Sequence, residues 1–221
     1  RSAALGELTR HGATGGWTVA GELGDRRIGV GLDSAGGSAK RMLRIDGEKA
    51  QAGDLADLIR IVWLTPAMDT VFRGGASDRR RFYDRQVMAH MPAHGPAAAN
   101  YEKAMRERNA LLERPSIDPA WADALEARMA EAGAEMAIAR SLVLGKLQAS
   151  VDARPQGAFP KALLSLEGEA EAMAAEGCGP AEIEAKLIET WRMMRRADAK
   201  AGRTLKGPHR SDLQVIHAPS G

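Results

Sequence analysis

The segment from Trp63 to Arg85, WLTPAMDTVFRGGASDRRRFYDR, constrains the fold of this chain more than any other stretch. It overlaps the end of an apolar run, Ile59 to Leu64 with one Arg inside, which predicts a strand. The strand is expected to end at Thr65-Pro66, because Pro66 has a fixed φ and disfavours helical backbone at the residue before it. A hinge is expected at Gly74-Gly75, where the backbone can adopt positive φ.

A helix is predicted directly after this hinge. Ser77 is a good N-cap, and Asp78 would lie in the first turn, where the helix dipole favours an anion. The helix then opens with three adjacent arginines, Arg79 to Arg81. Such a run is as typical of a solvated helix surface as of a binding site, so by itself it leaves both interpretations open.

The part of the chain before Thr65 is predicted to be rich in strands. Trp17 to Leu23, Arg27 to Asp33 and Lys40 to Ile45 alternate apolar with small or polar residues, which is the period of half-buried strands. Short links that contain glycine join them, as in an antiparallel meander. A short helix is expected near Asp54 to Leu58.

After Ser77 the hydrophobic period becomes that of helices. The predicted elements are a helix closed by Pro92, helices over Pro96–Glu113 and Ala120–Val151, a strand over Lys161–Leu166, a helix from Pro180 to Gly202 and a strand over Leu213–His217. Glu167 to Cys178 is expected to be a loose surface excursion. Methionines and leucines at helical spacing on the long helix indicate core packing rather than a cofactor groove.

These patterns predict an α+β fold with three parts. Residues 1–75 form an antiparallel, β-rich part of one lobe, residues 76–201 form an inserted helical lobe, and residues 202–221 return as a strand. The chain starts with Arg and stops soon after an extended run, so we expect a piece of a longer protein.

Composition narrows the function classes. Cys178 is the only cysteine, which excludes a disulfide framework and a thiolate metal site and fits a reducing cytoplasm. No apolar run approaches the length of about 20 residues that spans a bilayer. Lys and Arg outnumber Asp and Glu by eight to five in residues 77–114 and again in 178–212, whereas residues 116–176 carry five against ten. Two basic segments that flank an acidic one are compatible with a polyanion partner or with ordinary mixed helix surfaces.

A catalytic centre cannot be recognised in the sequence. There is no G-x-x-x-x-G-K-S/T phosphate loop, and Gly29 to Gly37 lacks both the Lys-Ser/Thr pair and a following helix. His90 and His94 are separated by Pro92 and lack an acidic partner, so no metal site is predicted. No Ser or Cys has the surroundings of a nucleophile.

Three motifs carry a resemblance to a known family. The first motif is LTP-x-x-D beginning at Leu64, followed by GG-x-SDRRRF-x-D beginning at Gly74. Together with YEKAMRERNALL over Tyr101–Leu112 and GRTLKGPHRSDL over Gly202–Leu213, it resembles the RecF family of bacterial recombination-repair proteins, in the same order and at fitting distances. The first resembles the passage from the ATPase lobe into the helical lobe, and the last resembles the return from that lobe.

The resemblance implies an ABC-type ATPase lobe, similar to the heads of SMC proteins. The phosphate loop of the family lies upstream of the matched part, and its signature motif and acidic Mg²⁺-binding strand lie downstream. The full-length protein is therefore expected to bind ATP and Mg²⁺ and to hydrolyse ATP slowly, whereas this piece should contain no catalytic residue and bind neither well.

The resemblance also suggests candidate site residues. Arg1, Thr65 and Asp69 would lie near the nucleotide, although Ala67 stands where many relatives carry Glu, which puts a direct contact from that position in doubt. Cations that could hold DNA phosphates are Arg79, Arg80, Arg85, Arg195, Arg196, Arg203, Lys206, His209 and Arg210. Residues expected to fix the junction of the lobes are Pro66, Gly74, Asp78, Arg81, Asp84, Gly207, Pro208 and Asp212.

A structural role remains open for the arginines as well. They could pair with Asp78, Asp84, Asp198 and Asp212, and for Arg81 and Arg210 we favour that interpretation. Few aromatic residues accompany the cations, which argues against stacking on single strands as the main binding mode.

By resemblance the intact protein would form an ATP-dependent homodimer in the cytoplasm at the nucleoid, with no membrane partner. It would bind double-stranded DNA and junctions of single and double strands, and load RecA together with RecO and RecR. The alternatives are another SMC-like or RecN-like repair ATPase head, or a non-catalytic helical interaction module.

Overall fold

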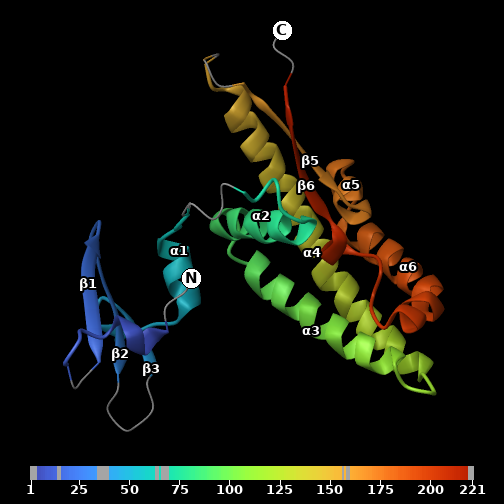
Figure 1. Cartoon of the computed structure of the whole chain (residues 1–221), viewed down its shortest axis with the longest axis horizontal. Coiled ribbons are helices and arrows are strands. Elements are labelled where there is room, and N and C mark those ends of the chain that lie inside the picture. The colour runs from blue at the N-terminus through green and yellow to red at the C-terminus, as the bar shows by residue number, and fades with distance from the viewer. Residues whose placement is uncertain are drawn as a thin grey trace. The chain divides into compact units, whose positions relative to one another are not determined.

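The computed structural model describes residues 4–13, 16–33, 40–62, 65, 70–155, 157 and 160–218. The chain divides into two compact units, Arg1–Arg60 and Ile61–Gly221 (Figure 1). The first unit is a four-stranded antiparallel meander with short helices before and after it. Its elements are η1 (Leu5–Leu8), β1 (Trp17–Leu23), β2 (Arg26–Asp33), β3 (Lys40–Ile45), β4 (Glu48–Lys49) and α1 (Ala52–Leu58).

The meander and the short helix were predicted, and the turns have the expected chemistry. Gly24 between β1 and β2 has φ +59°, and Asp46-Gly47 between β3 and β4 have φ values of +54° and +90°. Positive φ at both central residues is the backbone of the two-residue hairpin turn that asparagine, aspartate and glycine favour. The link between β2 and β3, which contains Gly36-Gly37, lies outside the described residues.

The predicted strand over Ile59–Leu64 is wrong in its described part, because residues 59–62 form no strand. Ile59 has extended backbone, but Ile61 and Val62 are 63% and 58% exposed. An apolar run with extended backbone becomes a strand only when a neighbouring strand satisfies its N–H and C=O groups, and none of the described strands pairs with it. Pro66 lies outside the described residues.

The second unit contains most of the helices and a two-stranded sheet. Its elements are α2 (Ala76–His90), α3 (His94–Leu112), α4 (Pro119–Asp152), β5 (Ala162–Glu167), α5 (Glu169–Ala175), α6 (Pro180–Ala201), η3 (Pro208–Arg210) and β6 (Asp212–His217). β5 and β6 pair antiparallel, with Leu164 opposite Val215. All helices and strands predicted after Ser77 are present, with bounds shifted by no more than two residues where bounds were stated.

Two local predictions in this unit are wrong. The N-cap of α2 is Gly75, with φ −78°, rather than Ser77, and neither Gly74 nor Gly75 has positive φ. The expected loose excursion after Glu167 contains α5, on which Ala170 and Glu171 are buried. An Ala/Glu-rich stretch has high helix propensity, and this one gains a buried face by packing against α4.

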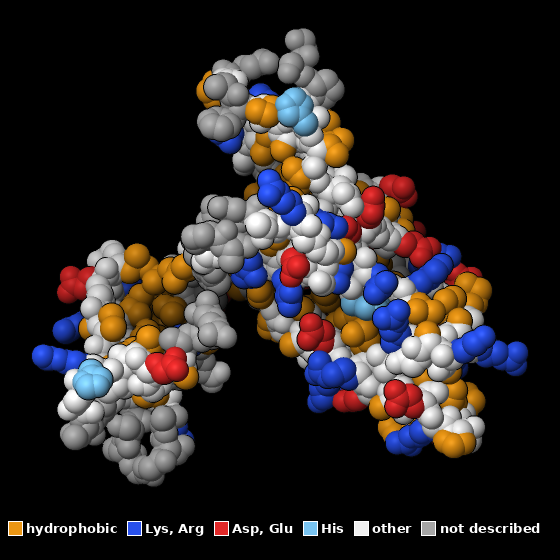
Figure 2. Space-filling view, in the orientation of Figure 1, with side chains coloured by type: hydrophobic (Ala, Val, Ile, Leu, Met, Phe, Trp, Pro, Cys, Tyr) orange, Lys and Arg blue, Asp and Glu red, His pale blue; other side chains and the backbone are white. Residues whose placement is uncertain are grey.

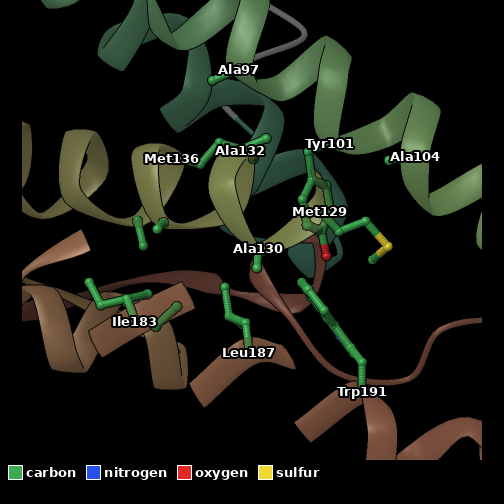
Figure 3. Packing of buried hydrophobic residues seen from close by; sticks show 13 residues of the cluster. Ala97, Tyr101, Ala104, Met129, Ala130, Ala132, Met136, Ile183, Leu187 and Trp191 are labelled. Carbon is green, nitrogen blue, oxygen red and sulfur yellow. The ribbon is translucent and has the colours of Figure 1, made fainter. Parts of the chain in front are cut away.

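The long helix α4 is the central element of the second unit. It packs against α3 and α6 over much of its length and also contacts α2, α5 and β5 (Figure 1). The main core lies between α3, α4 and α6 (Figure 3), where Tyr101, Met129, Ile183, Leu187 and Trp191 are buried. Small residues on α4, among them Ala130 and Ala137, allow this close packing because they let backbones approach. None of the described helices combines the length and the apolar composition that a membrane span requires.

Candidate nucleic-acid interface

The candidate interface is built around the segment that follows α6 and leads into β6. Gly202 ends α6 with φ +65°, the left-handed conformation that glycine adopts at helix C-termini. Figure 1 shows the chain leaving the end of α6, running back along it and entering β6 beside α2 and α4. Residues 202–212, called the return segment below, are held by side chains from the five helices α2 to α6.

A buried arginine on α3 holds the beginning of the return segment. Arg108 donates hydrogen bonds to Glu126 (2.9 Å), Asp198 (2.8 Å) and the hydroxyl of Thr204 (2.9 Å), as well as to the carbonyl of Trp191 (3.0 Å). The guanidinium and both carboxylates are fully buried. Because each charge is paired and hydrogen-bonded, this buried cluster avoids the penalty of an isolated ion.

The predicted junction residue Gly207 lies where only glycine fits. Its φ is +130°, and a Cβ there would lie 2.7 Å from the Tyr101 hydroxyl and 3.1 Å from the Trp191 ring. The indole N–H of Trp191 donates to the carbonyl of Lys206 (2.8 Å). The first turn after Gly207 is therefore pressed against the main core.

His209 is held in its neutral form next to Gly207. Its Nε2 donates to the Thr204 carbonyl (3.0 Å), and its Nδ1 accepts from the Tyr101 hydroxyl at 2.8 Å. Burial lowers the pKa of His209 to about 4, and the neighbouring cations Arg210 and Arg80 act in the same direction. As a neutral, structurally engaged side chain it offers little attraction to phosphate near pH 7.

A second buried arginine joins α2, α4, α5 and η3. Arg140 binds Asp84 with two hydrogen bonds (2.8 and 3.0 Å), and its third nitrogen donates to Glu171 (2.7 Å) and to the carbonyl of Pro208 (2.8 Å). His94 donates to the same Asp84 carboxylate (2.9 Å). Burial alone would raise the pKa of Asp84, but the bonds from His94 and Arg140 outweigh it and lower the pKa to about 2. Asp84 and Pro208 thus take part in this buried network, and their role in fixing the junction of the lobes stays a prediction.

Two of the three adjacent arginines fasten the start of β6 to α2. The guanidinium of Arg79 donates two hydrogen bonds to the Asp212 carboxylate (2.8 and 2.6 Å) and one to the carbonyl of Gly74 (2.6 Å). Hydrogen bonding between these two side chains raises the pKa of Arg79 and lowers the pKa of Asp212. Arg80 donates to the carbonyl of Ser211 (2.6 Å), and burial together with Arg140 lowers its pKa. Arg81 pairs with Asp78 on the exposed side of the helix.

The nine cations that sequence reasoning grouped together therefore occupy different environments. Arg195 binds Glu126 and Asp123, which raises its pKa, and Arg85 lies over the Phe82 ring with its guanidinium carbon 6.0 Å from the centroid. Of these nine, the exposed cations without a side-chain hydrogen bond or ion pair among the described residues are Arg196, Arg203, Lys206 and Arg210. The carboxylate pair that we favoured for Arg210 is therefore not found there. Whether any of the nine contacts DNA stays a prediction.

The acidic residues that were expected to fix the junction do form ion pairs. Asp78, Asp84, Asp198 and Asp212 each bind an arginine. Two of their partners, Arg108 and Arg140, were not singled out from the sequence. A signal was present, because both occupy core positions of their helices, for example Arg140 between Ala137 and Val143. A charged residue in the core phase of a helix indicates a buried pair.

The nucleotide-proximal candidates are only partly described. Arg1 and Asp69 lie outside the described residues, and Thr65 is exposed. Among the described residues, no group of three or more His, Cys, Asp or Glu side chains could hold a metal ion. Figure 2 shows Lys and Arg side chains spread over one face of the larger unit with Asp and Glu between them, rather than one continuous basic stripe.

Comparison with known proteins identifies relatives of this chain, although no protein-family model matches it. The DNA replication and repair protein RecF of Caulobacter vibrioides is 48% identical over 211 residues, which cover 91% of this chain and 54% of that protein. RecF of Rhizobium etli is 44% identical over 225 residues, covering 98% and 59%. The chain thus spans little more than half the length of the curated relatives it matches.

Solved structures agree with this assignment at the level of the fold. The recombination mediator protein RecF with ATPrS, from the RecFOR pathway, matches with a TM-score of 0.80 at 19% identity, over 97% of this chain and 59% of that one. The RecF–ATP structure of the same pathway matches with a TM-score of 0.76 at 18% identity. The predicted α+β class and the resemblance read from the three motifs are confirmed.

Proposed function

We propose that this chain, which corresponds to part of a RecF protein, comes from an ATP-dependent DNA-binding protein of recombinational repair. The observation that carries the proposal is the identity of 44–48% to proteins named DNA replication and repair protein RecF over at least 91% of the chain. Because the chain covers only part of those proteins, the ATPase activity, the homodimer and the Mg²⁺ requirement belong to the full-length protein and are part of the proposal.

The DNA partner of the intact protein is a duplex or a junction of single and double strands. Arg196, Arg203, Lys206 and Arg210 support this proposal, because exposed cations that have no partner within the described part of the protein are available to phosphates. Scarce aromatic residues, 4% of the chain, favour backbone contacts over stacking on bases. Binding of this kind does not depend on base sequence and weakens with salt.

The protein partners we propose are RecO and RecR, with which the intact protein would assist RecA loading at the nucleoid. The name of the pathway in which the two similar RecF structures were described, RecFOR, supports this assignment. Co-purification of the full-length protein with RecR, with and without ATP, tests it, and no retention of RecR under either condition would contradict it.

The first experiment on DNA measures binding of the full-length protein to gapped and blunt duplexes by fluorescence anisotropy, with and without ATP, across a salt series. The test variant is Arg196→Gln/Arg203→Gln/Lys206→Gln/Arg210→Gln. A matched control, Lys103→Gln/Arg106→Gln/Arg128→Gln/Lys146→Gln, removes the same charge from exposed positions on α3 and α4.

ATP-dependent binding is expected, and the test variant should bind more weakly with a salt dependence that is shallower by about 0.9 for each phosphate that it no longer binds. The control should bind like the wild type. Equal reductions in both variants would mean that net charge alone matters and would remove these four cations from the site. No DNA binding by the folded wild type with ATP would contradict the proposed function itself.

A further inference from the structure

A small pocket lies beside the return segment, between α5, α6 and the residues around Gly207. Its volume is about 260 Å³. Leu187 and Leu205 contribute apolar surface, and the polar part of the lining consists of Glu169, Thr190, Lys206, Arg210 and Ser211. Three consecutive elements of the chain, α5, α6 and the return segment, thus bring two cations and two hydroxyl-bearing residues to one concave site.

Most of these polar side chains have no hydrogen-bond or ion-pair partner within the described part of the protein. Thr190 lines the pocket from the buried side of α6, and its hydroxyl has no hydrogen-bond partner among the described residues. The side chains of Lys206 and Arg210 also lack a partner there. By contrast, the Ser211 hydroxyl donates to Glu171 (2.7 Å). The hydroxyl of a buried residue and two cations, all without partners among the described residues, leave donors available to a ligand.

The electrostatic field of the pocket favours an anion. Besides Lys206 and Arg210, Arg80 is bound to the backbone of Ser211, and Arg210 is close enough to lower the pKa of Arg80. The one carboxylate on the rim, Glu169, lies 3.9 Å from Lys186 and is partly neutralised by it. Convergent positive charge next to apolar walls strengthens attraction of an anion relative to an open surface.

The wall that carries the cations is held in place before any ligand binds. Trp191 fixes the carbonyl of Lys206, Arg140 fixes the carbonyl of Pro208, and Arg80 fixes the carbonyl of Ser211. A binding site whose backbone is already ordered loses less conformational freedom on binding. This distinguishes Lys206 and Arg210 from Arg196 and Arg203, which do not line the pocket.

We propose that this pocket binds a single phosphate group of a DNA backbone through Thr190, Lys206 and Arg210. The inference rests on the proposed function and adds a defined site to it. A phosphodiester has two charged, non-bridging oxygens that can accept from a guanidinium, an ammonium and a hydroxyl at once. A carboxylate of an acidic protein shares part of this chemistry, and the experiment separates the two sources.

The test uses the full-length protein with ATP and duplex DNA across a salt series. Thr190→Val removes one hydroxyl and no charge, so a purely electrostatic surface would not respond to it. In the proposed pocket, it should weaken binding by about threefold to tenfold without changing the salt dependence. Lys206→Gln/Arg210→Gln should reduce the salt dependence by about 0.9, because both cations share one phosphate. The charge-matched double variant Arg196→Gln/Arg203→Gln should reduce the salt dependence by up to about 1.8, because its two cations can contact two separate phosphates.

A double-mutant cycle decides the outcome, with unfolding midpoints confirming that each variant is folded. The effect of Thr190→Val should persist in the Arg196→Gln/Arg203→Gln background and vanish in the Lys206→Gln/Arg210→Gln background. Equal effects in both backgrounds, or none in the wild type while DNA still binds, would overturn the pocket and leave the proposed function intact. If Thr190→Val weakens binding of an oligo-glutamate peptide but not of DNA, the pocket takes a carboxylate and the phosphate assignment is wrong.

Discussion

Arginine side chains play three different roles in this molecule. Arg108 and Arg140 are buried and tie helices to the return segment, Arg79 pairs with a carboxylate near the surface, and Arg203 is exposed and has no partner among the described residues. The buried ones are the most consequential for stability, because removing one guanidinium would leave carboxylates uncompensated in the interior, which costs about 3–5 kcal/mol. A basic run in a sequence therefore does not by itself indicate a binding surface.

His209 gives a prediction at the residue scale. Its pKa in the folded protein is about 4, below the value of about 6.5 for an unfolded histidine. The unfolded chain therefore binds a proton between these pH values, while the folded chain does not. Lowering the pH from 7 to 5 should reduce the free energy of unfolding by about 2 kcal/mol through this residue. Asp84 adds nothing in this range, because its pKa values in both states, about 2 and 3.8, are lower.

Urea denaturation of the chain at pH 7 and pH 5 measures this effect. The variant His209→Gln should lose most of the pH dependence, whereas His217→Gln, which changes an exposed histidine on β6, should retain it. If the two variants showed the same pH dependence, His209 would not be held neutral by its surroundings.

At the scale of elements, the packing of α4 depends on small residues. Gly133 faces three partners, and a Cβ there would lie 3.1 Å from Leu187 and 3.4 Å from both Pro208 and Tyr101. Helix α3, helix α6 and the return segment thus all approach α4 at one glycine. Gly145 lies further along the same helix, and nothing would lie within 4 Å of its Cβ.

The different surroundings of the two glycines predict that a change from glycine to alanine has opposite effects on stability at these two positions of α4. Gly133→Ala should lower the free energy of unfolding by about 1–2 kcal/mol, because the clash exceeds the gain in helix propensity. Gly145→Ala should raise it by about 0.5–1 kcal/mol, because only the propensity term acts there. Thermal or urea unfolding of both variants provides the measurement, and stabilisation by both would show that the core around Gly133 can expand.

At the scale of the whole molecule, the two compact units differ in how they are stabilised. The described part of the second unit contains three clusters of buried apolar residues and both buried arginine networks. In the first unit, the described buried apolar side chains are Leu32, Leu43 and Ile45. The second unit therefore has the larger share of the interactions that support independent folding.

A shortened chain of residues 70–218 tests this difference. It should keep its helical circular dichroism and unfold cooperatively, with a urea midpoint for the helical signal close to that of the 221-residue chain. A loss of helicity or a broad transition in the shortened chain would show that the helical unit requires residues before Thr70.

The order of the elements followed from local sequence alone. Pro119 after Asp118, Gly202 after a basic turn, and Asp46-Gly47 between alternating runs each act within a few residues, so helix ends and turns could be predicted. The three family motifs are equally local, and they led to the assignment that the relatives confirmed. The apolar run at Ile59 failed as a prediction because strand formation requires a partner that local sequence does not specify.

Tertiary structure alone decided which charges are available to a ligand. Arg79, Arg80, Arg203 and Arg210 all lie within the family motifs. The first two nevertheless bind β6 and the residue before it, whereas the last two are exposed without partners among the described residues. The pairing of the first two joins residues more than 130 positions apart. The pocket at Thr190 exists only where the consecutive elements α5, α6 and the return segment pack against one another. Periodicity determines which face of a helix is buried, but the partner of a buried or half-buried charge depends on how distant elements pack.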